Sequence, residues 1–552
     1  MAIDVRPADG PEALPAPAPA HGSRRLPWAV LALAPALAAG LSLYRITGRS
    51  LGFDEGATAA IVSQHGSALW AAIAHDGGNM SGWYLLLHVL TGAFGDGLLV
   101  LRLPSALAAV AIVALVGALA DRLFDRRTAV AAGVLAAISL PLVYWAQTAR
   151  SYSGLVAFSC AAMLAFVRLA DPRDGEAPGR GAWLAFVASL TLAMYCSIVA
   201  VLLVPAQVLA LVRRRAALRR VGSALAAVAA LSVPLAVLAV RRGSGQLFWV
   251  PRPTGEVESQ VLQSITSAGL SPVFHHATGT YVLMWATVAA VVAAAAYELW
   301  RAARGLGSWA SALMLAWCAL PPALTFAWSF IGQPIFVPRN LLTSTPAVGL
   351  VLAPPLVSAI GRRRPRSRKR APGPRPGPAV TSGRAVGVLP AVLLGALIAA
   401  RVIPLAAAYG VSPEPWQQVT RRVLAASRPG DCIAFYPQDA RMAFAYYAGA
   451  DPRAPRSILP VVAWGVVRPY VESYRTLSPA QLAARSAGCR RMWFVTSHEG
   501  QANGPAPSRA HRARWHALRA ELERSFGAAP VQVFGYASRI HVQLLPGRAA
   551  GG

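Results

Sequence analysis

The sequence SLGFDEGATAAIVSQHGSALWAAIAHDGGNMSGWYLLLH, from residue 50 to residue 88, decides how the rest of the chain is arranged. It follows directly on the first strongly apolar segment and carries Asp54, Glu55, His75 and Asp76. Ionisable groups beside apolar segments are costly unless they are paired or used, so they mark a candidate functional site. The orientation of every later segment depends on whether the end of this stretch crosses a membrane.

The composition indicates a membrane protein with several spans. Of its 552 residues, 55% are hydrophobic and 14% are charged, against about 25% charged in a typical soluble domain. The formal net charge of +29 comes from arginines that lie in short loops between apolar runs. Such loops are enriched in Lys and Arg on the cytoplasmic side, so the charge predicts topology. We therefore expect the lipid bilayer, and no nucleic acid, as a partner.

The segment 83–94, WYLLLHVLTGAF, is too short to cross the hydrocarbon at 1.5 Å per residue, and it has His88 in its middle. We expect it to lie in the membrane interface as an amphipathic helix. The span 104–120 then runs inward, the basic loop 121–127 is cytoplasmic, and the span 128–145 returns to the outer side. Had 83–94 been a span, all later loops would change sides.

By length, about eleven spans are predicted. They are 26–43, 104–120, 128–145, 153–169, 182–196, 197–212, 221–240, 281–300, 308–330, 341–360 and 386–405. The strongly basic segments 213–220, 301–304 and 361–370 all fall on the cytoplasmic side in this arrangement, as the positive-inside rule requires.

The chain divides into three parts. Residues 1–25, rich in Ala and Pro, are expected to be a disordered cytoplasmic N-terminus. Residues 26–405 are expected to form the transmembrane module, with a first outer loop at 45–103 and a cytoplasmic linker at 361–385. Alternating helix and strand patterns predict an extracytoplasmic α/β domain at 406–552. Cys432 and Cys489 can pair there if the domain faces an oxidising compartment.

Polar residues from four separate segments meet on the outer face in this topology. They are Asp54, Glu55, His75, Asp76, Asn79, Arg102, Gln147, Arg150, Tyr152 and Arg339. A carboxylate can take the proton of an acceptor hydroxyl, while arginines can hold a leaving phosphate through two parallel hydrogen bonds. This combination is suited to moving a sugar from a lipid phosphate, because arginines can stabilise the leaving anion without a general acid.

Five motifs carry a resemblance to a known family. They are FDEGAT (53–58), YLLLH (84–88), RLPSALAAVAIVAL (102–115), LFDRRTAVAAGVLAAISLPLVYWAQTARSYS (123–153) and VPRNLL (337–342). In this order they resemble the GT-C type membrane glycosyltransferases, in the branch of the protein O-mannosyltransferases and aminoarabinose transferases (glycosyltransferase family 39-like). The resemblance covers about residues 26–405 and implies the GT-C fold.

The resemblance also implies a function and roles for single residues. The donor would be a polyprenyl-phosphate sugar, and transfer would be inverting and on the outer face. The catalytic Asp after the first helix falls on Asp54, and the phosphate-binding arginine falls on Arg102. The family's Gln-x-x-Arg-x-Tyr motif falls on Gln147, Arg150 and Tyr152. The chain departs from its relatives at DGGNM (76–80), where many have a His-Pro-Pro type sequence, which leaves the acceptor and any metal open.

Each candidate also has a structural interpretation. Asp54 can act as a helix N-cap, and Glu55 can be a first-turn acid that the helix dipole favours. Arg102 and Arg339 can be interfacial anchors, and Arg150 can pair with a carboxylate for stability alone. No residues have the spacing of a metal motif, so no cofactor is predicted and a divalent metal is left open.

We therefore expect a multi-pass cell-membrane glycosyltransferase with a cytoplasmic N-terminus and an extracytoplasmic C-terminal domain. Asp54 is the expected base, Glu55 and Asp76 are expected to help orient the acceptor, and a glycan, lipid or protein hydroxyl is the expected acceptor. The phosphate is expected to be held by Arg102, Arg150 and Arg339. A lipid or glycan transporter or flippase, and a non-catalytic envelope-binding membrane protein, are the alternatives. Transporters usually carry inverted repeats and ionisable groups near the midplane, whereas the acids of this chain lie at the outer edge and its sequence has no visible repeat.

Overall fold

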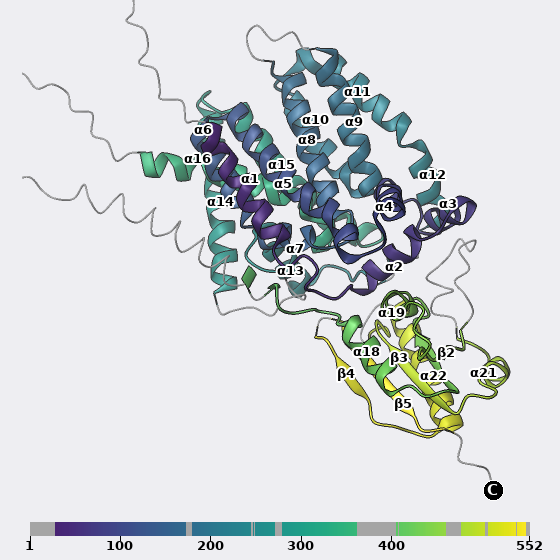
Figure 1. The fold of residues 1–552 in the computed structure, drawn as a ribbon. Helices are drawn as coiled ribbons and strands as arrows, with labels where there is room; N and C mark the ends of the chain where they lie inside the picture. The colour runs from purple at the N-terminus through teal and green to yellow at the C-terminus, as the bar shows by residue number, and fades with distance from the viewer. Residues whose placement is uncertain are drawn as a thin grey trace, which may run out of the picture.

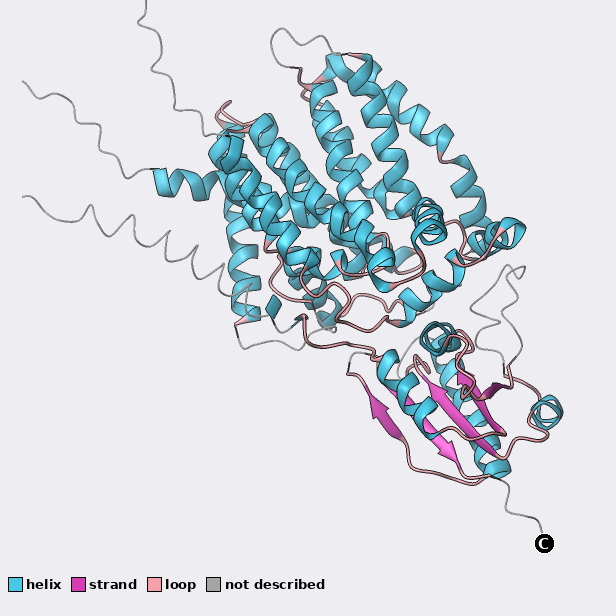
Figure 2. Ribbon diagram, in the orientation of Figure 1, coloured by secondary structure: helices cyan, strands magenta, loops and turns pink. Residues whose placement is uncertain are grey.

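The computed structural model describes residues 28–172, 179–243, 247, 249–270, 279–361, 405–406, 408–459, 476–502, 506–536 and 538–547. These residues form a bundle of helices and, at the C-terminal end of the chain, a smaller unit built around a β-sheet (Figure 1, Figure 2). The predicted N-terminal segment 1–25 and nearly all of the predicted linker 361–385 lie outside the described residues.

The helical part contains α-helices and short 3-10 helices (Figure 1). In chain order they are α1 (Trp28–Leu43), α2 (Phe53–Val62), α3 (Gly66–His75), α4 (Ser81–Phe94), α5 (Leu98–Leu123), α6 (Arg126–Ala137), α7 (Leu140–Ala146), α8 (Tyr152–Ala170), α9 (Arg180–Cys196), η1 (Ile198–Leu203), α10 (Val204–Leu211), η2 (Arg215–Ala217), α11 (Leu218–Leu231), α12 (Val233–Arg242), α13 (Gly255–Ile265), α14 (Thr280–Ala303), α15 (Trp309–Ile331), η4 (Pro338–Ser344) and α16 (Thr345–Gly361).

Within the described residues, five helices are long and apolar enough to cross a membrane, and two bent pairs raise the number to seven. The pairs are α6 with α7, bent by 61°, and α11 with α12, bent by 49°. Pro141 and Pro234 lie at the start of the second helix in each pair, where a missing N–H and a fixed φ break the hydrogen-bond ladder.

The remaining apolar helices are shorter: α1, α9, and η1 with α10. Together with the seven they occupy the ten spans that the sequence predicts before residue 361. The predicted eleventh, 386–405, lies outside the described residues apart from Leu405. The total of about eleven stays a prediction.

Three short helices, α2 to α4, connect α1 with α5 and lie at the end of the bundle that faces the C-terminal unit (Figure 1). Helix α4, which contains the segment 83–94, has 14 residues and is not among the helices long enough to span. Its Trp83 Nε1 donates to the carbonyl oxygen of Ala149 at 3.2 Å. This contact holds α4 against the connection between α7 and α8.

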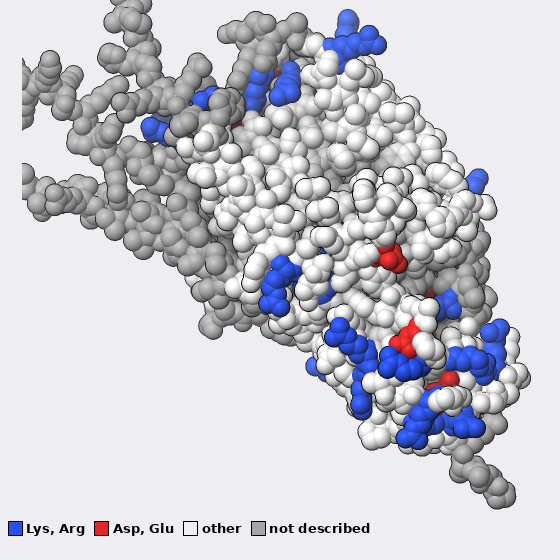
Figure 3. All heavy atoms as spheres, viewed as in Figure 1, with Lys and Arg blue, Asp and Glu red and all other residues white. Residues whose placement is uncertain are grey.

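The basic loops gather at the other end of the bundle. Arg214 pairs with Asp171 at 3.1 Å and stacks on the ring of Trp309, and Arg122 donates to the Asp171 carbonyl at 3.0 Å. Between the two ends, the face shown in Figure 3 has a wide belt without charged side chains. Such a belt is what lipid tails require.

The C-terminal unit has helices on both faces of its sheet. Its elements are α18 (Trp416–Ala426), β1 (Asp431–Tyr436), α19 (Ala440–Ala448), β2 (Arg456–Ser457), α21 (Pro479–Arg485), β3 (Arg491–Thr496), α22 (Ala506–Phe526), β4 (Gln532–Phe534) and β5 (Ile540–Leu545). The strand order is β2-β1-β3-β5-β4. Strands β2, β1 and β3 are parallel, whereas β5 is antiparallel to β3 and β4.

Two apolar layers hold this unit together. Helices α18 and α19 pack on one face of the sheet around Trp416 and Phe435, and α22 packs on the other around Leu522 and Phe494. Cys432 and Cys489 form a disulfide. The α/β character predicted for the C-terminal part is confirmed.

Candidate active site

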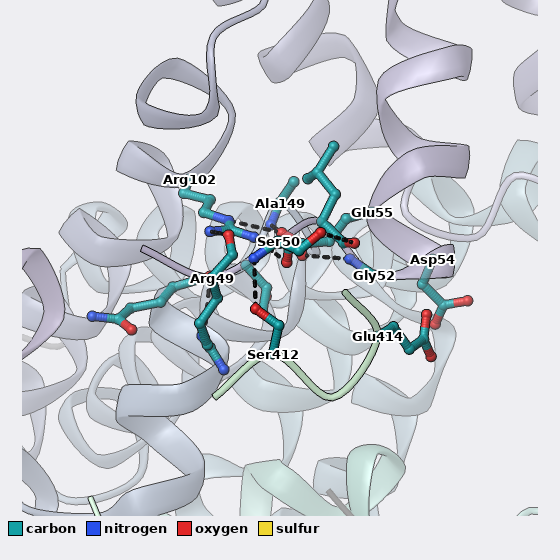
Figure 4. Close-up of polar contacts among 12 residues, drawn as sticks. Arg49, Ser50, Gly52, Asp54, Glu55, Arg102, Ala149, Ser412 and Glu414 are labelled. Carbon is teal, nitrogen blue, oxygen red and sulfur yellow. Dashed lines mark hydrogen bonds and ion pairs between the residues drawn. The ribbon is translucent and has the colours of Figure 1, made fainter. Parts of the chain in front are cut away.

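The first turn of α2 carries two successive carboxylates, and they face different surroundings. Glu55 is buried and forms a two-point ion pair with Arg102 of α5, at 3.0 Å to Nε and 2.9 Å to Nη2 (Figure 4). The Glu55 carboxylate also accepts the backbone N–H groups of Ala149, at 2.7 Å, and Gly52, at 3.2 Å. It therefore ties α2 to α5 and to the connection between α7 and α8.

Arg102 uses all five of its N–H groups within the chain. Beside the two bonds to Glu55, Nη1 donates to the carbonyl oxygens of Ile46 and Arg49, both at 2.9 Å, and Nη2 donates to the carbonyl oxygen of Ser50 at 3.1 Å. Its side chain is 1% exposed. Arg102 thus fixes the backbone that leads into α2, and in this arrangement it has no N–H group left for a phosphate.

The side chain of Asp54 points away from Glu55 and Arg102, and it is half exposed. Its Oδ2 accepts from Nη1 of Arg339 at 3.1 Å, and 47% of its side chain is exposed. Arg339 lies at the start of η4 and stacks over the ring of Trp249 at 4.2 Å. Burial raises the pKa of Asp54, but the neighbouring Arg150, Arg339 and His498 outweigh it and bring that pKa below its usual value. The carboxyl group is therefore ionised at neutral pH.

Arg150, between α7 and α8, lies behind Asp54. Its Nη1 donates to the Asp54 carbonyl oxygen at 3.3 Å, to Thr58 Oγ1 at 3.1 Å and to the Tyr84 hydroxyl at 3.4 Å. Its Nε is buried and has no hydrogen-bond partner among the described residues. The guanidinium thus holds α2 on one side while keeping one donor unused.

Asp76 continues the network. Its carboxylate accepts from the Tyr84 hydroxyl at 2.8 Å and from Arg242 of α12 at 2.9 Å. The two glycines that follow have φ of +69° and +73°, and a Cβ on Gly77 would lie 2.4 Å from Cδ of Arg242. Only glycine lets Arg242 pass over this turn, so the DGGNM segment packs against α12.

The other predicted site residues are less central. The side-chain amide of Gln147 donates to the carbonyl oxygens of Leu41, Ser42 and Tyr44. It thereby provides hydrogen-bond donors for carbonyl oxygens that have no partner within the helix at the C-terminal end of α1. Tyr152 is buried and its ring packs on Trp145. Asn79 accepts from the Ile198 backbone at 3.4 Å, and half-buried His75 ends α3.

The structure therefore brings Asp54, Asp76, Arg150 and Arg339 around one small region. Glu55 and Arg102 lie beside it in the interior of the protein, while Gln147 and Tyr152 pack behind it. The predicted assignments of catalytic and binding roles to single residues stay predictions.

Several residues at this region were not predicted. Tyr84 lies within the YLLLH motif, and Trp249 lies in the connection between α12 and α13, which has no recognisable pattern. Arg242 could have been found, because it ends a span on the predicted outer side, where the positive-inside rule does not favour arginine. Glu414 and His498 belong to the C-terminal unit, and Figure 4 shows Glu414 next to Asp54.

Among the described residues no group of three or more His, Cys, Asp or Glu side chains could hold a metal ion. The arrangement can instead bind an anion with arginines and accept a proton on an ionised carboxylate.

Part of the chain resembles a known protein family. Residues 80–239 match the family model described as dolichyl-phosphate-mannose-protein mannosyltransferase. A comparison with curated protein sequences finds no match.

Two solved structures have a similar fold. ArnT from Cupriavidus metallidurans in the apo state is 15% identical with a TM-score of 0.50, and the match covers 93% of this chain and 97% of that chain. The archaeal oligosaccharyltransferase AglB from Archaeoglobus fulgidus, in complex with an inhibitory peptide and a dolichol-phosphate, is 12% identical with a TM-score of 0.53, over 86% of this chain and 69% of that chain. The resemblance found in the sequence is thereby confirmed: residues 80–239 match a family model of this class, and the chain has the GT-C fold.

Proposed function

We propose that this chain transfers a sugar from a polyprenyl-phosphate donor to a hydroxyl acceptor, with inversion, and that Asp54 is the base. The observation that carries the proposal is the position of Asp54: an ionised, half-exposed carboxylate with two arginines beside it. The dolichol-phosphate in the AglB structure supports a lipid phosphate as part of the donor. The family match over residues 80–239 supports the same donor class.

Arg339 and Arg150 are the best candidates to hold the donor phosphate. Arg339 is 30% exposed and its present partner is the carboxylate of Asp54. Arg150 keeps a buried Nε without a partner among the described residues. Arg102, which the family resemblance would assign to the phosphate, has its five donors in use, so we give it a positioning role together with Glu55.

The ion pair between Asp54 and Arg339 gives a simple order of events. An incoming phosphate competes with Asp54 for Arg339, because guanidinium groups bind phosphate and carboxylate in the same way. The carboxylate is then released as the donor arrives. Asp54 takes the proton of the acceptor hydroxyl, the acceptor oxygen bonds to the anomeric carbon, and the bond from that carbon to the phosphate oxygen breaks. The polyprenyl phosphate leaves as an anion held by the arginines.

The same proposal places the site on the outer face of the cell membrane, with a cytoplasmic N-terminus. The acceptor would be a glycan, lipid or protein hydroxyl, and the parts of the chain would be 1–25, 26–405 and 406–552. The collection of basic loops at the far end of the bundle supports this orientation. The disulfide between Cys432 and Cys489 supports it as well, because disulfides persist in oxidising compartments.

Replacing Asp54 tests the proposal most directly. Asp54→Asn keeps the size and the hydrogen-bonding oxygen but removes the base, so kcat should fall by about 10²–10⁴-fold. The measurement is the release of polyprenyl phosphate by the purified protein in lipid nanodiscs, with polyprenyl-phosphate-linked hexoses and pentoses as donors.

Asp121→Asn is the matched control, because Asp121 pairs with Arg126 at the opposite end of the bundle. It should leave kcat unchanged. Full activity of Asp54→Asn with the same donor would overturn the assignment of the base.

A further inference from the structure

The segment that leads into α2 is held by the C-terminal unit. The backbone N–H of Ser50 donates to Ser412 Oγ at 2.9 Å, that of Leu51 donates to the Tyr447 hydroxyl at 2.7 Å, and that of Phe53 donates to the Glu414 carboxylate. Figure 4 shows Ser412 and Glu414 on the strip of chain that passes below this segment. Three of the four consecutive N–H groups from residue 50 to residue 53 thus depend on residues more than 350 positions away in the sequence.

Helix α19 packs directly on α2 as well. A Cβ on Gly56 would lie 2.7 Å from Cα of Ala443, so the two helices approach more closely than any side chain at this position would allow. In return, the Gln417 backbone N–H at the start of α18 donates to Ser50 Oγ at 2.9 Å. The contact is therefore reciprocal and closely packed.

Glu414 lies at the centre of this contact. Its carboxylate accepts the N–H of Phe53, the residue directly before Asp54, and its other oxygen lies 3.6 Å from Nε2 of His498. The His498 ring packs against the Phe53 ring with 4.7 Å between centroids. His498 follows the end of β3, at the carboxyl edge of the parallel strands, where α/β units commonly place their binding residues.

We propose that the C-terminal unit forms part of the catalytic centre, in which Glu414 is a positioning residue that sets Asp54 by holding the first turn of α2, and His498 keeps Glu414 in place. This inference rests on the proposed role of Asp54 as the base. Reacting groups must be held within about 0.5 Å of their working geometry, and a misplacement of about 1 Å can cost about 10²-fold in rate. Glu55 and Arg102 fix α2 from the membrane side, and Glu414 fixes it from the opposite side.

Three replacements at this contact separate positioning from substrate binding. Glu414→Ala removes the acceptor of the Phe53 N–H, so kcat should fall by about 10- to 100-fold while the KM for the donor changes little. Glu414→Gln keeps an oxygen that accepts the same bond and should restore most of the lost kcat. If Glu414 instead acted on the acceptor through its charge, Glu414→Gln would be as inactive as Glu414→Ala, and the proposal would be wrong.

Tyr447→Phe decides the question even if Glu414→Ala does not fold, because it removes one hydroxyl without changing the shape of the interface. It should lower kcat by several-fold and speed the hydrogen exchange of the amides from residue 50 to residue 53. Glu521→Ala, in an exposed pair with Arg524 on α22, is the matched control and should change neither. Wild-type kcat and wild-type exchange in Tyr447→Phe and in Glu414→Ala would overturn the proposal.

The two proposals fail in different ways. If Asp54→Asn is fully active, the proposed base is wrong, and the exchange measurement still tests whether Glu414 holds α2. If Asp54→Asn is inactive while both Glu414→Ala and Tyr447→Phe are as active as the unmodified chain, the base stands and the positioning role alone is wrong.

Discussion

Two ion pairs start from neighbouring residues of α2 and differ in almost every physical respect. In the pair of Glu55 with Arg102 the side chains are 8% and 1% exposed, whereas in the pair of Asp54 with Arg339 they are 47% and 30% exposed. The first lies between α2 and α5 with every guanidinium donor in use. The second lies on the other side of the helix, towards η4 and the C-terminal unit.

This difference in exposure indicates which of the two pairs can take part in a reaction. Removing one partner of a buried pair leaves an uncompensated charge, so such a pair is difficult to open and serves to fix geometry. A half-exposed pair contributes little to stability and can exchange its partner for a ligand at low cost. One turn of helix thus combines a buried ion pair that fixes geometry with an accessible carboxylate.

The largest expected effect concerns stability and compares the two arginines. Arg102→Ala should destabilise the protein by about 3–5 kcal/mol, because Glu55 stays buried without its partner and three carbonyl oxygens lose their donor. Arg339→Ala should cost about 1 kcal/mol or less. Thermal and denaturant unfolding of both variants in the same detergent measures the difference.

A reversed result would change the interpretation of the site. If Arg102→Ala unfolds like the unmodified protein and instead loses affinity for the lipid donor, Arg102 holds the phosphate as the family resemblance implies. Arg102→Lys refines the comparison, since a lysine keeps the charge but cannot form the two-point contact with Glu55.

Much of the helical architecture follows from the sequence. Apolar length alone locates the long helices of the bundle, and the short segment 83–94 lies in a helix of 14 residues. The alternation of the predicted spans also places the loops that carry Asp54, Arg150 and Arg339 at the same end of the bundle. Helix positions can be predicted in this way because the bilayer constrains length and polarity more strongly than it constrains packing.

The division of roles within the site could not be predicted. Whether Asp54 or Glu55 faces the interior depends on the rotation of α2 against its neighbours, which the side chains of α5 and α19 set together. The sequence spacing shows that both acids lie in one turn, but not which one is buried. Glu414 is separated from Asp54 by 360 residues of chain, and no periodic pattern connects them.

The second expected effect is on donor affinity. Arg339→Ala should raise the KM for the lipid donor by about 10- to 100-fold, because a hydrogen bond to a charged group contributes about 1.5–3 kcal/mol and about 1.4 kcal/mol corresponds to a factor of ten. Arg339→Lys should recover part of the loss, as one point charge remains. Steady-state kinetics and binding of the lipid donor to nanodisc samples provide the measurement.

Arg304→Ala is the control for this effect, since Arg304 follows α14 at the basic end of the bundle and stacks on Trp300. Its donor KM should match that of the unmodified chain. An unchanged KM in Arg339→Ala would mean that the phosphate is held elsewhere, and Arg150 would then be the first alternative.

The smallest expected effect is a change in pH dependence. Burial raises the pKa of Asp54, while Arg150, Arg339 and His498 lower it further than burial raises it. As the proposed base, Asp54 works only when it is ionised, so we expect activity to be lost as the pH falls through this pKa. Removing Arg339 takes away one of the charges that lower the pKa, and the acidic limb of kcat/KM in Arg339→Ala should therefore move to higher pH.

Arg242→Ala, which removes the arginine that pairs with Asp76, is the control and should leave the acidic limb of kcat/KM at the same pH. An acidic limb at the same pH in Arg339→Ala and in the unmodified chain would show that it reports a group other than Asp54.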